Sequence, residues 1–119
     1  MIDQPSAFSV FRKWRDSMKP LMVDAELGVI AFTFEGTLIR VEEPLVGFLL
    51  DDCGSIEFIF DESWGFDFAS PDALRLAVET RVGESALRGR QYEYGETVFA
   101  VRSNGSRMIF LEIVKEVRP

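Results

Sequence analysis

Two β-rich segments near the end of the chain, residues 96–102 and 107–117, flank the dipeptide Asn104-Gly105. Asn-Gly strongly favours a two-residue type I′ turn, so the two segments are predicted to form a β-hairpin. The two-residue loop would pair Phe99 with Phe110 and Val101 with Met108 on one face, and Ala100 with Ile109 and Val98 with Leu111 on the other. Both faces are apolar. This hairpin must therefore be central and be covered on both sides, by a helix, a second sheet layer or a partner subunit.

Further strands are expected earlier in the chain. Residues 27–43 are predicted to form a hairpin around Gly36-Thr37, because glycine at the first loop position suits a type II′ turn. Leu45–Leu50 is nearly all apolar, and a strand is favoured over a short helix there. Residues 55–60 alternate and predict a strand. Residues 61–69 are predicted to be a loop.

Two helices are expected. Residues 6–19 carry Phe8, Phe11, Trp14 and Met18 at helical spacing, with Ser6 as N-cap and Pro20 as the stop. A second helix is expected over 71–82, where Ser70 suits an N-cap and Gly83 a C-terminal stop.

These elements predict an α+β fold. Residues 1–119 would form a single domain, with a mainly antiparallel sheet of about six or seven strands and two helices. The expected order is α-β-β-(β)-β-α-β-β-β, with a weakly alternating strand over 86–94. No motif identifies a family.

The residue composition limits the kinds of catalytic and metal sites that the chain can form. The chain has no histidine and a single cysteine, Cys53, in 119 residues. Nucleophilic systems that need histidine, histidine-ligated metals and internal disulfides are therefore excluded. No phosphate-binding glycine loop, dinucleotide fingerprint or nucleophile elbow is present. We expect a cytoplasmic protein that is not an enzyme and needs no cofactor.

The net charge of −7 is distributed unevenly. Between Asp24 and Asp72 there are twelve acidic residues and one base, Arg40, so this segment carries −11. It predicts an acidic surface that would attract a basic protein partner. The alternative is that arginines of the C-terminal strands neutralise these carboxylates in the folded protein. Binding to nucleic acid or to an anionic membrane is disfavoured by the negative charge.

The segment around Gly65 carries three large aromatic residues: Trp64, Phe66 and Phe68. Such residues in a loop are typical of a plug over the core or a dimer contact, of a ligand-pocket wall, or of a partner-binding surface. All three alternatives stay open at this point.

Paired carboxylates neighbour this segment. Together with Asp67, the runs Asp51-Asp52 and Asp61-Glu62 could hold a divalent cation in principle, but their spacing is not that of a calcium loop, so no metal site is predicted. A predicted strand would carry four basic or aromatic residues on one face: Arg88, Arg90, Tyr92 and Tyr94. This face could stack on single-stranded nucleic acid. The favoured alternative is a solvent-exposed sheet face whose arginines pair with the carboxylates of the acidic segment.

The sequence thus favours a non-catalytic interaction module of inhibitor or immunity type that binds a basic partner. The predicted partner-binding residues are Trp64, Phe66, Asp51, Asp52, Asp61 and Glu62. The alternative is a small-molecule binding domain with a phenylalanine-lined pocket, signalled by an open apolar cavity of roughly 300 Å³ or more with a few polar groups. A homodimer is compatible with both functions.

Overall fold

The computed structural model describes residues 2–50, 54–68 and 91–117 of the chain. In this part of the chain one helix precedes seven strands. Their bounds are α1 (Gln4–Asp16), β1 (Pro20–Leu27), β2 (Ile30–Glu42), β3 (Leu45–Leu50), β4 (Ser55–Ile59), β5 (Trp64–Phe68), β6 (Gln91–Arg102) and β7 (Arg107–Val117).

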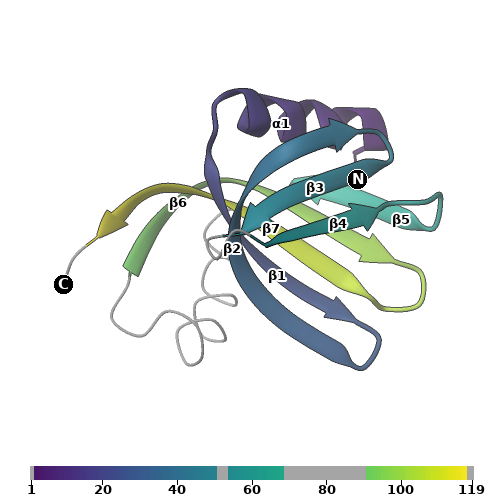
Figure 1. The fold of residues 1–119 in the computed structure, drawn as a ribbon. Helices are drawn as coiled ribbons and strands as arrows, with labels where there is room; N and C mark the ends of the chain where they lie inside the picture. The colour runs from purple at the N-terminus through teal and green to yellow at the C-terminus, as the bar shows by residue number, and fades with distance from the viewer. Residues whose placement is uncertain (1, 51–53, 69–90, 118–119) are drawn as a thin grey trace.

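The seven strands form one antiparallel sheet in the order β4-β3-β2-β1-β7-β6-β5. The two outermost strands, β4 and β5, follow one another in sequence and are joined by residues 60–63 alone. Such a short connection requires the two edges of the sheet to approach each other, because a few residues span only about 3.5 Å each. The sheet is accordingly curled, with α1 lying across one side of it (Figure 1).

The inside of the curled sheet is filled largely by aromatic rings. From α1, Phe8, Phe11 and Trp14 are fully buried, and they meet rings from the strands and from the connection after β4. Phe11 is central: its ring centroid lies 5.1 Å from that of Phe110 and 5.2 Å from that of Phe8. The aromatic stripe predicted for this helix is thus the main contribution of α1 to the core.

A second apolar cluster lies on the opposite face of the sheet. It consists of Met22, Tyr94, Ile109, Leu111 and Ile113, with Phe99 packed against it. Alternate residues of β7 therefore point into different clusters, Met108 and Phe110 inward and Ile109 and Leu111 outward. The expected interior position of the β6–β7 hairpin is confirmed, and so is the burial of both faces of β7, but the outer face of β6 is only partly buried, with Val101 38% exposed.

The register of that hairpin differs from the prediction. Val98 pairs with Phe110 and Phe99 with Ile109, one residue away from the predicted pairs. The cause is the loop: the N–H of Gly105 donates to the carbonyl of Arg102 at 2.9 Å, and Gly105 has a φ of 92°. A type I turn followed by a left-handed glycine makes a three-residue loop. The one extra loop residue shifts the register by one, so residues that were predicted to share a face of the hairpin lie on opposite faces.

The predicted first hairpin is also wrong in position. Residues 30–42 form one continuous strand, β2, which runs through Gly36 without turning. The turn lies at Gly28-Val29 instead, where Gly28 has a φ of 64° and Leu27 pairs with Ile30. The two-residue turn therefore does have glycine at its first position, but this glycine is Gly28 and not Gly36. Because the turn comes earlier, the residues before it form β1, a strand that the sequence did not predict. Pairing of β1 with β2 buries Leu21, Val23 and Ala25 in the core, which favours this turn.

Helix α1 both begins and ends earlier than predicted. It begins after Asp3, whose carboxylate accepts a hydrogen bond from the N–H of Ser6 at 2.9 Å, so Asp3 and not Ser6 is the N-cap. It ends at Asp16 with Ser17 as C-cap, and Met18 is left 76% exposed rather than on the buried stripe.

Only part of the predicted loop over 61–69 is a loop, because Trp64–Phe68 forms strand β5, which pairs with β6. The strands at Leu45–Leu50 and Ser55–Ile59 are confirmed. The antiparallel sheet is confirmed, with one helix in the described residues. The predicted helix over 71–82, the turn residues 51–53 and most of the strand predicted over 86–94 lie outside the described part of the chain.

Candidate ligand pocket

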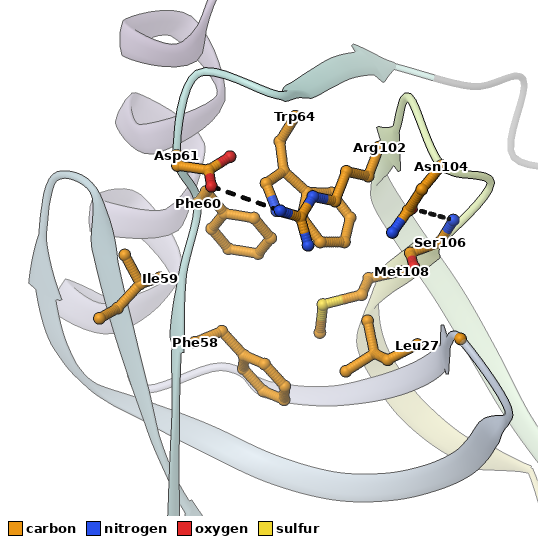
Figure 2. A pocket seen from close by; sticks show the side chains of 11 residues that line it. Leu27, Phe58, Ile59, Phe60, Asp61, Trp64, Arg102, Asn104, Ser106 and Met108 are labelled. Carbon is orange, nitrogen blue, oxygen red and sulfur yellow. Dashed lines mark hydrogen bonds and ion pairs between the residues drawn. The ribbon is translucent and has the colours of Figure 1, made fainter.

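A pocket of about 350 Å³ opens between the β1–β2 turn, the end of β4, the connection 60–63 and the β6–β7 turn (Figure 2). It lies where the two edges of the curled sheet approach each other. The residues that line it are Leu27, Gly28, Phe58, Ile59, Phe60, Asp61, Trp64, Arg102, Asn104, Ser106 and Met108.

Strand alternation explains how Arg102 reaches this pocket. Val98 and Ala100 of β6 point into the core, and Arg102 is the next residue on the same face. Its partner across the β5–β6 ladder is Trp64, which packs against the same core. Because successive side chains of a strand alternate between faces, the inward row of β6 ends in a guanidinium at the rim of the pocket.

The pocket is apolar at its base. Phe60 and Met108 are almost fully buried there, while Phe58, Leu27 and Trp64 are half-buried around them. The Phe60 and Trp64 rings meet edge to face, with centroids 5.2 Å apart and an interplanar angle of 90°. The half-buried side chains therefore offer apolar surface to a bound molecule, while Phe60 and Met108 support them from below.

The rim carries two opposite charges that one serine holds in place. Arg102 Nε donates to Ser63 Oγ at 2.8 Å, and the Ser63 hydroxyl donates to Asp61 Oδ1. The backbone N–H of Ser63 also donates to Asp61 Oδ1, at 2.9 Å. The remaining atoms, Arg102 Nη2 and Asp61 Oδ2, are 3.6 Å apart, longer than a typical hydrogen bond.

These hydrogen bonds also favour the ionised carboxylate. The pKa of Asp61 is lowered from its ordinary value, first by the side-chain hydrogen bond from Ser63 and then by the backbone one, with a smaller contribution from Arg102. The rim therefore carries a carboxylate and a guanidinium at neutral pH. Beside Arg102, on the β6–β7 turn, Asn104 Oδ1 accepts the N–H of Ser106 at 2.9 Å, which orients the Asn104 amide (Figure 2).

The predicted partner-binding residues separate in the structure. Asp61 and Trp64 line the pocket, whereas Glu62 is exposed and does not line it. Phe66 is 2% exposed and packs in the core against Phe8 and Phe60, as the core-plug alternative expects. Its ring is therefore not offered to a partner at the surface. Asp51 and Asp52 lie outside the described residues.

Several carboxylates of the acidic segment pair with arginines. Arg107 binds Glu26 through Nε at 3.0 Å, and Arg102 faces Asp61. Arg40 lies 2.8 Å from Glu42 and 3.5 Å from Glu57. Asp24 is 3% exposed and accepts a hydrogen bond from Thr33. The pairs with Arg102 and Arg107 follow the alternative in which arginines of the C-terminal strands neutralise the segment, whereas Arg40 belongs to the segment itself.

Arg102, Asn104 and Ser106 were not singled out from the sequence as site residues. The available signal was the row Val98-Ala100-Arg102, in which a charge follows two small apolar residues at a spacing of two. Within the described residues no group of three or more acidic or cysteine side chains could hold a metal ion, and no helix is long and apolar enough to cross a membrane.

Comparisons with known proteins give no relative from which a role could be transferred. The chain matches no protein-family model, no curated protein and no solved structure.

Proposed function

We propose that this protein is a small-molecule binding domain and that its ligand lies in the pocket between the β1–β2 and β6–β7 turns. The observation that carries the proposal is a pocket of about 350 Å³ in which half-buried apolar side chains lie beside a polar rim. Ligand sites in proteins are typically concave and mostly apolar, with a few placed polar groups, and begin at about 300 Å³.

The proposed role is binding rather than catalysis. The chain has no histidine, and the pKa of the Asp61 carboxyl at the rim is lowered, which keeps it ionised at neutral pH. An Asp61 held in this form is poorly suited to exchange protons there. A cytoplasmic location remains part of the proposal, because Cys53 is the sole cysteine.

The interaction with a basic protein partner stays a prediction, and so does a homodimer. The pairs of Glu26 with Arg107 and of Asp61 with Arg102 reduce the charge that the acidic segment would present to such a partner. The pocket is therefore the better supported basis for a function.

The two tryptophans allow a direct test, because Trp64 lines the pocket while Trp14 is fully buried in the core. In the Trp14→Phe variant, Trp64 is the only fluorescent tryptophan, and in the matched Trp64→Phe variant only Trp14 remains. The probes are benzoate, benzyl alcohol, phenethylamine and L-phenylalanine.

We expect at least one probe to change the Trp64 emission saturably and to leave the Trp14 emission unchanged. The proposal is overturned if no probe changes the Trp64 emission at millimolar concentration. It is equally overturned if both variants respond alike, because the probe would then act on the whole fold.

A further inference from the structure

The charged pair at the rim restricts the kind of molecule that fits the pocket. Ser63 holds the inner atoms of both groups, Asp61 Oδ1 and Arg102 Nε, through its own hydroxyl. The outer atoms, Asp61 Oδ2 and Arg102 Nη2, are left at 3.6 Å, close enough to attract and too far apart for a good hydrogen bond. A ligand can therefore bind both groups without first breaking a strong contact.

Opposite charges at this separation favour a ligand that itself carries both signs. A purely anionic molecule would meet the Asp61 carboxylate, and a purely cationic one would meet the Arg102 guanidinium. A zwitterion with ammonium and carboxylate on the same carbon atom satisfies both at once: the ammonium donates to Asp61, and the carboxylate accepts from Arg102. Amino and carboxyl groups on more distant carbons would fit the 3.6 Å spacing less well.

The size and base of the pocket select the rest of the molecule. At roughly 30 Å³ for each water-sized group, a volume of this size holds on the order of a dozen non-hydrogen atoms. The half-buried side chains of Leu27, Phe58 and Trp64 offer apolar surface directly inside the charged rim. A free α-amino acid with an aromatic or large aliphatic side chain has this size and this division into polar and apolar parts.

We propose that the ligand class of this pocket is the free apolar α-amino acid, held by Asp61 at its ammonium and by Arg102 at its carboxylate. This inference rests on the proposed small-molecule function and names its ligand. The amino acid side chain would lie against Phe58 and Trp64, and the Asn104 amide lies beside Arg102 at the rim (Figure 2).

The test compares L-phenylalanine with two analogues that each lack one charge. The analogue 3-phenylpropionate has no ammonium, and phenethylamine has no carboxylate. Binding is followed through the Trp64 emission of the Trp14→Phe protein. We expect each analogue to bind at least about tenfold more weakly, because each loses a charge-assisted hydrogen bond and leaves one charge of the rim unmatched.

Variants of the rim assign each half of this preference. In Asp61→Asn the preference for L-phenylalanine over 3-phenylpropionate should disappear, while the retained amide oxygen can still accept from Ser63. In Arg102→Gln the preference over phenethylamine should disappear. Arg40→Gln is the matched control: Arg40 pairs with Glu42 and Glu57 and does not line the pocket, so both preferences should stay.

The outcomes separate this inference from the proposed function. Equal binding of all three compounds, or preferences unchanged in Asp61→Asn and Arg102→Gln, would overturn the amino acid proposal and leave a pocket for apolar molecules. Binding of none of them, together with no response to the other aromatic probes, would overturn both. Thermal unfolding of each variant, compared with Arg40→Gln, shows whether a lost preference reflects a lost fold.

Discussion

Trp64 and Arg102 are direct partners across the β5–β6 ladder, so the indole and the guanidinium leave the sheet on the same face. That face is the inner one, where Trp64 meets the edge of Phe60 and Arg102 meets Ser63. One cross-strand pair thus supplies both an apolar wall and a charge to the pocket. The properties of the fold around it lead to four predictions.

The first prediction concerns the aromatic core. Phe11 is fully buried, and its ring meets those of Phe8, Phe60, Phe66 and Phe110. Phe11→Ala should lower the free energy of unfolding by about 3–5 kcal/mol, because it removes a buried ring and leaves a cavity. Urea unfolding measures this. Phe68→Ala is the control, because Phe68 is 42% exposed and should lose much less; equal losses would contradict the core described here.

The second prediction concerns pH and the start of α1. The pKa of Asp3 is lowered from its ordinary value of 3.8, chiefly by the side-chain hydrogen bond with Ser6. A lowered pKa means that the folded state favours the ionised group. The stabilisation is therefore complete well above pH 3.8 and is lost as the pH falls through the lower folded-state pKa.

Replacing Asp3 tests this contribution. Asp3→Ala should lower the urea midpoint at pH 7 and flatten the decline of stability below about pH 4, where Asp3 titrates. Asp3→Asn keeps a side-chain oxygen that can cap the helix, so it should retain more of the stability at pH 7 while showing the same flattening. An acid profile unchanged in both variants would count against the cap.

The third prediction concerns the β6–β7 turn. Gly105 has a φ of 92°, and nothing lies within 4 Å of the position that a Cβ would take there. Gly105→Ala should therefore destabilise through the backbone alone, by roughly 1–2 kcal/mol. Gly105→Asn should cost less, because asparagine tolerates positive φ better than alanine. Thermal or urea unfolding distinguishes the two; equal stability of both variants and the wild type would contradict the three-residue loop.

The fourth prediction concerns the pairing of acidic and basic residues. Arg107 donates to Glu26 through Nε at 3.0 Å and Nη2 at 3.2 Å, and the two side chains are 42% and 35% exposed. A double-mutant cycle with Glu26→Gln and Arg107→Gln should give a coupling energy below about 1 kcal/mol that decreases with added salt. The more exposed pair Lys115–Glu93 is the comparison and should couple less strongly. A coupling energy of zero for Glu26–Arg107 at low salt would show that this pair does not neutralise part of the acidic segment.

Local patterns predicted several elements correctly. The aromatic stripe of α1 follows from helical spacing, and the strands at Leu45–Leu50 and Ser55–Ile59 follow from their apolar residues. The burial of both faces of β7 was also readable, because apolar residues occupy consecutive positions there. In each case the information lies within a few neighbouring residues.

The turns were harder to predict, because their positions depend on which strands pair with each other. Gly28-Val29 and Gly36-Thr37 both place glycine first, and only the pairing of β1 with β2 and β7 selects the former. Gly36 is needed within the strand for a different reason: a Cβ there would lie 3.0 Å from the carbonyl oxygen of Leu49. A sequence pattern does not distinguish a glycine that turns from one that admits a neighbouring backbone.

By itself, the sequence determined the amphipathic helix, the apolar strands and the absence of histidine chemistry, because these depend on residue type and short-range spacing. Only the tertiary structure decided the hairpin registers and the curl of the sheet, because these depend on pairing between distant segments. That curl brings the connection after β4 against the end of β6. The charge that looked like a property of one acidic segment is, at Asp61, half of an ion pair with Arg102 at the rim of a pocket.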